Sequence, residues 1–140
     1  MSNKIITVWR GGMTFESDNP SGQTVLMDTS IPERDTRDGL SPKAMMLSSL
    51  AGCSGLDVVS ILDKMKVNNY DFKMEVEGEL TKEHPKYYHT VTLDYHFTGN
   101  DLNQVKIKKA VDLSIEKYCG VMEMFRRFAQ INTNIHFHNS

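Results

Sequence analysis

Alternating apolar and polar positions divide the first third of the chain into three short β-type segments. They run from Ile5 to Trp9, from Met13 to Glu16 and from Thr24 to Met27. Residues typical of turns separate them, chiefly glycine, asparagine, proline and serine. Short strands joined by tight turns pair with their sequence neighbours. The pattern therefore predicts a small antiparallel meander.

A polar segment then leads into the most apolar part of the chain. Residues 28–41 form a long charged connection, of a kind that often carries function. Ser41 and Pro42 make a good helix start, and the apolar pattern continues to about Met65. Because apolar residues cover more than one face, we expect protein to surround this helix. We infer that a second copy, related by a two-fold axis, supplies part of that cover.

The rest of the chain mixes strand and helix periodicities. Segments with a period of two predict half-buried strands, and segments with three- and four-residue spacing predict helices. The strands are Phe72 to Leu80, Thr90 to Phe97 and Ile131 to Phe137, and the helices are Leu102 to Tyr118 and Val121 to Phe128. The order βββαββααβ predicts an α+β fold in a single domain, residues 1–140.

Composition narrows the function classes. The net charge is −2 and no long run of like charges occurs, so a nucleic-acid partner is not expected. The N-terminus lacks the pattern of a signal peptide, and we expect a cytoplasmic protein. Serines, glycines and Asp57 interrupt the apolar stretch from Ala44 to Leu62, which argues against a membrane span and favours a buried core helix.

Two cysteines, Cys53 and Cys119, carry the candidate chemistry. In a reducing compartment two distant thiols are either inert core residues or a redox pair. A thiolate metal site would need histidines as further ligands. His136 and His138 share a face of the last strand, but without an acid or cysteine at fixed spacing they are interpreted as surface residues, so no metal is expected. Three other histidines are candidates for the third ligand of such a metal site: His84, His89 and His96.

Three segments give the chain a resemblance to the OsmC/Ohr family. They are the run from Ser41 to Cys53, the sequence Glu116-Lys117-Tyr118-Cys119-Gly120-Val121, and the opening Val8-Trp9-Arg10-Gly11-Gly12-Met13-Thr14-Phe15. The resemblance implies antiparallel sheets packed around a long central helix in an intertwined, swapped-strand homodimer. It also implies active sites at the dimer interface and reduction of organic hydroperoxides and hydrogen peroxide.

By the same resemblance, Cys53 is the peroxidatic cysteine and Cys119 the resolving one. A thiolate attacks the peroxide O–O bond, becomes a sulfenic acid and condenses with the second thiol to a disulfide. In the family an arginine from the loop before the helix activates the thiolate. Arg34 is closest to that placement, with Arg37 and Arg10 as alternatives. No cofactor is implied, and the expected reductant is a dithiol of lipoyl or thioredoxin type.

The sequence departs from the family where an acid normally follows the proline. Lys43 and Ala44 stand there, and a cation in the first helical turn opposes the helix dipole. In one interpretation Lys43 supplies a positive charge near the pocket, with an acid of the loop orienting the arginine: Glu33, Asp35 or Asp38. In the other the peroxidase site is altered, and the protein is a non-catalytic small-molecule-binding or redox-sensing member of the family.

Asp57 lies four residues after Cys53 and so on the same side of the helix. A carboxylate beside a thiolate opposes its formation unless the carboxylate is itself paired. We therefore expect Asp57 to face a partner cation or to serve the dimer contact.

Overall fold

The computed structural model describes residues 1–29 and 39–140, which form two compact units, Met1–Met46 and Leu47–Ser140. In the first unit, strands β1 (Thr7–Trp9), β2 (Phe15–Asp18) and β3 (Thr24–Met27) pair antiparallel in that order. Glycine serves the turn between β1 and β2, where Gly11 has φ +100°. The predicted meander is confirmed.

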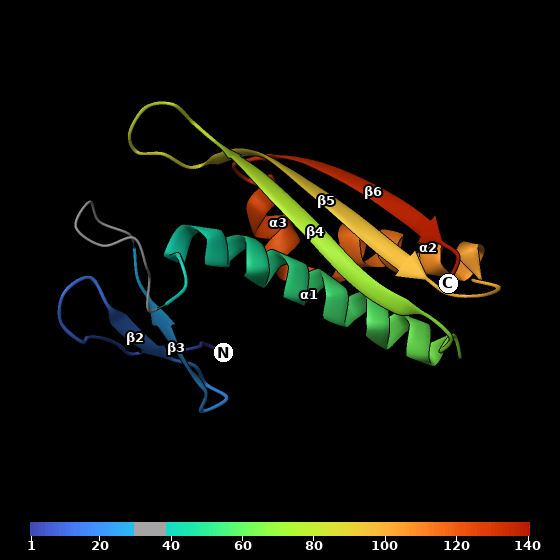
Figure 1. The fold of residues 1–140 in the computed structure, drawn as a ribbon, viewed down its shortest axis with the longest axis horizontal. Helices are drawn as coiled ribbons and strands as arrows, with labels where there is room; N and C mark the ends of the chain where they lie inside the picture. The colour runs from blue at the N-terminus through green and yellow to red at the C-terminus, as the bar shows by residue number, and fades with distance from the viewer. Residues whose placement is uncertain (30–38) are drawn as a thin grey trace. The chain divides into compact units, whose positions relative to one another are not determined.

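Helix α1 (Pro42–Lys64) begins in the first unit and continues through the second. Its observed bounds match the predicted start at Pro42 and the predicted end near Met65. By length and apolar composition alone α1 is able to cross a membrane, but core helices of globular proteins pass the same test. It lies along the sheet of the second unit (Figure 1).

The second unit contains a three-stranded sheet with the order β4-β5-β6. Its elements are β4 (Asp71–Leu80), β5 (Tyr88–Thr98), α2 (Gln104–Leu113), the π-helix η1 (Ser114–Tyr118), α3 (Gly120–Arg126) and β6 (Gln130–His138). Strands β4 and β5 are antiparallel, whereas β5 and β6 are parallel. Parallel pairing follows from the connection, because α2, η1 and α3 carry the chain back across the sheet before β6 begins. The sheet is therefore mixed, where the expectation was for antiparallel sheets.

The helices of the second unit lie on one face of this sheet (Figure 1). The alternate side chains of β5 that point to the helices are fully buried, namely Val91, Leu93, Tyr95 and Phe97. Ile107 and Val111 of α2 and Met122 of α3 close the same core. Burying each large apolar side chain contributes about 1.5–3 kcal/mol. This packing holds α1 close to the segment that follows α2.

Only one stripe of α1 is buried among the described residues. Leu50, Ser54, Val58 and Leu62 recur at four-residue intervals and are fully buried, whereas Leu56 on another side is 74% exposed. The apolar pattern predicts protein on more than one side of this helix. The single chain fully covers one stripe of it. Leu47, Cys53 and Ile61 are partly buried against the core, whereas Met46, Leu56 and Val59 are exposed.

Candidate active site

The fold brings the two cysteines together from distant parts of the sequence. Cys53 lies in the middle of α1, and Cys119 lies between η1 and α3. Their sulfur atoms and a carboxylate oxygen of Asp57 lie within 4.8 Å of one another. Both thiols are free, Cys119 is buried and Cys53 is partly exposed. The arrangement is therefore a dithiol with a carboxylate beside it.

A local irregularity of the helix places the Cys119 sulfur. After α2 the chain continues as a π-helix, and the Cys119 N–H donates to the Ser114 carbonyl at 2.9 Å. Cys119 then turns to extended backbone and caps α3, its Sγ accepting a hydrogen bond from the Met122 N–H at 3.3 Å. The Arg126 guanidinium donates to the Ile115 carbonyl and so ties α3 to η1. Short π-helical segments of this kind are frequent at functional sites.

Burial governs the protonation of Cys119. Desolvation is the largest influence and raises the pKa of Cys119 to about 11. The hydrogen bond from Met122 acts in the opposite direction, and the neighbouring Cys53 and Asp57 raise the pKa further. Cys119 is thus a neutral thiol at physiological pH.

A buried chain of hydroxyl groups lies under the cysteines. Ser54 Oγ is 2.7 Å from the Tyr95 hydroxyl and 2.8 Å from Ser114 Oγ. Ser114 Oγ in turn lies 3.3 Å from Asp57 Oδ2, to which it donates. Burial raises the pKa of Tyr95 to about 12, so its hydroxyl stays protonated. The sequence does not predict this network, although Ser54, a serine among the apolar positions of α1, is a signal for it.

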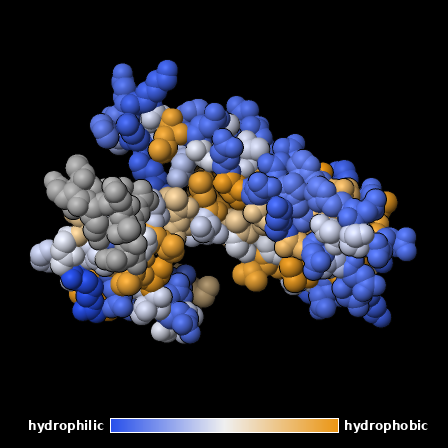
Figure 2. All heavy atoms as spheres, in the orientation of Figure 1, coloured by the Kyte–Doolittle hydropathy of each residue, from blue (hydrophilic) through white to orange (hydrophobic). Residues whose placement is uncertain are grey.

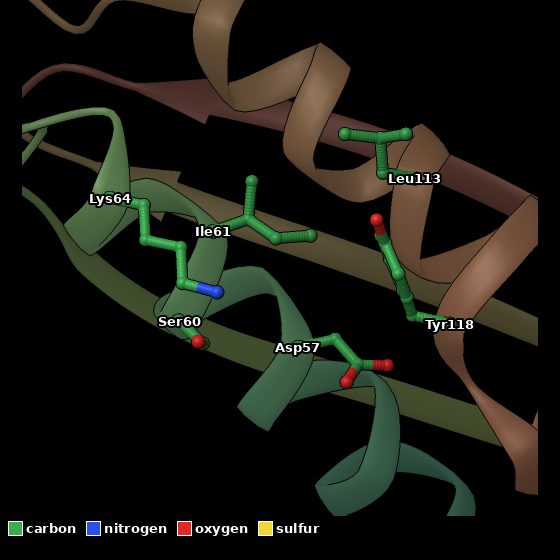
Figure 3. A pocket seen from close by; sticks show the side chains of 6 residues that line it. All are labelled: Asp57, Ser60, Ile61, Lys64, Leu113 and Tyr118. Carbon is green, nitrogen blue, oxygen red and sulfur yellow. The ribbon is translucent and has the colours of Figure 1, made fainter.

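An open cavity of about 320 Å³ adjoins Asp57. Asp57, Ser60, Ile61 and Lys64 reach into it from α1, and Leu113 and Tyr118 line its other side (Figure 3). Apolar and charged groups alternate along this wall. The cavity gives a small organic molecule access to the carboxylate beside the dithiol.

Within residues 1–29 and 39–140, Cys53, Asp57 and Cys119 are the group that brings three possible metal ligands this close. Thiolate and carboxylate are both zinc donors.

The predicted histidine face forms, but the rings of His96 and His136 stack with centroids 4.5 Å apart. His136 Nε2 contacts Asp94 at 2.8 Å and His96 Nε2 contacts Glu75 at 2.8 Å.

The structure leaves the predicted arginine untested. Arg34 and Arg37, with the acids considered as their partners, Glu33, Asp35 and Asp38, lie outside the described residues. Arg10 belongs to the first unit, where it forms an ion pair with Glu16 at 2.6 Å. Lys43 is exposed in the first turn of α1. Asp57 makes no ion pair with the residues that the structure describes, so its expected partner cation is not among them.

Comparison with known proteins agrees with the fold and the cysteine motifs. The family model of OsmC-like proteins matches residues 35–134. The chain is 36% identical over 123 residues to protein YhfA of Escherichia coli K12, covering 88% of this chain and 89% of that protein. This chain belongs to the OsmC family. The predicted resemblance is therefore confirmed.

Solved structures show how far the OsmC fold is shared. A hypothetical protein from Aquifex aeolicus VF5 superposes with a TM-score of 0.80 and 26% identity over 98% of both chains. The organic hydroperoxide resistance protein OhrB of Bacillus subtilis gives a TM-score of 0.61 and 17% identity, over 96% of this chain and 98% of that one. The α+β fold predicted for this OsmC family member is thus confirmed.

Proposed function

We propose that this OsmC family member is a thiol-dependent peroxidase that reduces organic hydroperoxides and hydrogen peroxide through Cys53 and Cys119. One observation carries the proposal: the fold gathers two free sulfurs, distant in sequence, to within 4.8 Å. A side-chain rotation with a small backbone shift closes such a gap to the S–S length of about 2.05 Å. An inert pair of core cysteines has no need of this proximity.

Each sulfur has a distinct part in the reaction. The Cys53 thiolate attacks the terminal peroxide oxygen, the O–O bond breaks, and the products are a Cys53 sulfenic acid and an alkoxide that is protonated to the alcohol. The Cys119 thiol then displaces hydroxide from the Cys53 sulfur, giving a disulfide and water. Cys53 is partly exposed, which makes it accessible to the peroxide. Cys119 is buried, which suits a thiol that reacts only after the sulfenic acid has formed.

Family membership supports a role in peroxide resistance. The organic hydroperoxide resistance protein of Bacillus subtilis has the same fold. The apolar part of the cavity wall, Ile61 and Leu113, suits the alkyl portion of an organic hydroperoxide. For the return to dithiol we propose a cellular dithiol of lipoyl or thioredoxin type, since thiol–disulfide exchange is the shortest route back.

We also propose that the working unit is a homodimer. Among its described residues the first unit presents many large apolar side chains to solvent, including Ile5, Ile6, Val8, Trp9, Met13, Phe15, Leu26 and Leu40. Leu56 and Val59 add a second apolar area on α1. A second copy of the chain is the simplest cover for both areas.

A second candidate function is redox sensing or small-molecule binding without turnover. The observation that favours it is the absence of an acid in the first turn of α1, where the family pattern has one. In that case the thiols react with peroxide slowly or not at all. The cavity beside Asp57 then holds a ligand rather than a substrate.

The test compares the reduced protein with Cys53→Ser and Cys119→Ser after one equivalent of cumene hydroperoxide. A peroxidase loses both thiols within seconds and about two mass units, and Cys119→Ser accumulates a trappable sulfenic acid. The reaction should stop completely in Cys53→Ser. Thiols that persist for minutes in the wild type would instead favour the binding function.

A further inference from the structure

Among the described residues, Asp57 places a carboxylate beside both sulfurs, and the reaction above gives it no part. Its carboxylate oxygen lies within 4.8 Å of the sulfur atoms of Cys53 and Cys119. We propose that Asp57 is the general base that takes the proton of the Cys119 thiol while this thiol attacks the oxidised Cys53. The proposal rests on the peroxidase function, and it assigns a catalytic residue to the second chemical step.

The second step needs such a base. A thiol is a poor nucleophile until it loses its proton, and Cys119 is buried with 4% of its surface exposed. Burial raises the pKa of this thiol to about 11, so a very small fraction is thiolate at neutral pH. A base has to lie within hydrogen-bond reach or one water away. The Asp57 oxygen satisfies this condition.

The surrounding side chains hold the carboxylate in place. Ser114 Oγ donates to Asp57 Oδ2 at 3.3 Å, and Ser114 is itself anchored through Ser54 to the Tyr95 hydroxyl. All three anchoring residues are fully buried, so the chain of hydroxyls is fixed by the core. A carboxylate has several lone-pair sites, so one held by the serine hydroxyl can still accept a proton from a thiol.

The charged and titratable neighbours of Asp57 come from three elements. Cys53 precedes it by one turn on α1, and Lys64 lies further along the same cavity wall. Tyr118 faces the cavity from η1, and Tyr95 connects from β5 through Ser54. Among the described residues none forms an ion pair with Asp57.

The step balances without another reactant. The Cys119 S–H bond breaks and its proton moves to the Asp57 carboxylate. The sulfur electron pair attacks the Cys53 sulfur, and the S–O bond of the sulfenic acid breaks. The departing hydroxide takes the proton from Asp57 and leaves as water. Asp57 returns to its starting state, and the dithiol has reduced one peroxide to alcohol.

The experiment separates the two chemical steps in a single turnover. Reduced wild type, Asp57→Asn and Asp63→Asn are mixed with one equivalent of cumene hydroperoxide and quenched at intervals. Sulfenic acid is counted by dimedone addition and the disulfide by intact mass. Asp63 is the matched control, because it is an exposed carboxylate on the same helix. Circular dichroism establishes that each variant is folded, and Asp57→Glu tests whether a carboxylate on a longer arm restores the rate.

We expect sulfenic acid to form in Asp57→Asn at least as fast as in the wild type, because the carboxylate no longer opposes the Cys53 thiolate, while disulfide closure slows by about 100-fold or more. Closure in Asp57→Asn should accelerate about tenfold per pH unit between pH 7 and 9, following the thiolate fraction, whereas the wild type stays level over this range. Asp63→Asn should behave as the wild type, and Asp57→Glu should recover part of the rate.

Two results would overturn the assignment. Closure at the wild-type rate in Asp57→Asn would mean that no base is needed there. Slow closure with an unchanged pH profile, not recovered in Asp57→Glu, would mean that Asp57 acts by positioning alone. A wild type and a Cys119→Ser variant that form no sulfenic acid would refute the peroxidase function itself, which is a different outcome.

Discussion

The two units of the chain differ in what they bury. Among the described residues, every fully buried apolar side chain belongs to Leu47–Ser140, where the helices cover one face of the β4-β5-β6 sheet. Among the described residues of the first unit, the buried side chains are polar, Ser17 and Asp28. Figure 2 shows apolar groups at the surface of the first unit and along α1. The second unit therefore has its own hydrophobic core, whereas the described residues of the first unit bury no large apolar side chain.

The candidate site belongs to the unit that has the buried core. Cys53, Asp57, Cys119 and the hydroxyl network all belong to residues 47–140 and are held by core packing. The first unit contributes no described group to this cluster. Its apolar strands are the part of the chain that the proposed homodimer would cover.

The largest expected effect is in the core of the second unit. Phe97 is fully buried and stacks on Phe72 with centroids 4.5 Å apart. Phe97→Ala should lower the free energy of unfolding by about 3–5 kcal/mol in urea titrations. Phe15→Ala, on the exposed sheet of the first unit, should cost less than about 1 kcal/mol at protein concentrations where the chain is monomeric. Equal costs at the two sites would remove the distinction between the units.

The next effect tests whether a second copy of the chain covers the exposed apolar side of α1 and the first unit. Leu56 is 74% exposed on α1, and Leu56→Asp should weaken self-association by about 100-fold, because a second copy would have to bury the new charge. Sedimentation measures the dimer. The protein's single tryptophan, Trp9 in β1, should become more accessible to acrylamide as the dimer dissociates. Val105→Asp is the control, since Val105 on α2 is 80% exposed and is expected to leave association unchanged.

A smaller effect concerns the buried thiol of the second unit. The pKa of Cys119 is raised from 9.0 to about 11, so folding favours the protonated thiol. That stabilisation is complete below pH 9 and is lost as the pH rises to 11, by at most about 2–3 kcal/mol. Unfolding of reduced Cys119→Ala should lack this loss. Tyr95→Phe removes the separate contribution of Tyr95, whose pKa is raised to about 12.

The smallest effect belongs to the solvent face of the same sheet. The hydrogen bond from His136 lowers the pKa of Asp94, so the ionised Asp94 stabilises the fold above its ordinary pKa and the benefit is lost as the pH falls. Because the pair is partly exposed, His136→Gln should change the free energy of unfolding by less than about 1 kcal/mol at pH 7. A larger loss would show that this face is covered in solution.

Much of the fold was predictable because its signals are local. Strand alternation in β2, β3, β4 and β5, and the Ser41-Pro42 start of α1, depend on residues within a few positions of one another. The cysteine motifs identified the family without any coordinates. Parallel pairing of β6 was not predicted, because periodicity carries no information on which neighbour a strand chooses.

The candidate site shows the same division between what local sequence signals predict and what tertiary packing decides. The sequence alone supplied Cys53 and Cys119 as a candidate redox pair, through the family resemblance, and Asp57 as a residue on the side of Cys53. The tertiary structure decided the rest: the π-helical turn that delivers Cys119, its burial, and the Ser54-Tyr95-Ser114 network that holds Asp57. The physical reason is that desolvation and hydrogen bonding between distant segments depend on how α1, β5 and η1 pack, which no local pattern specifies.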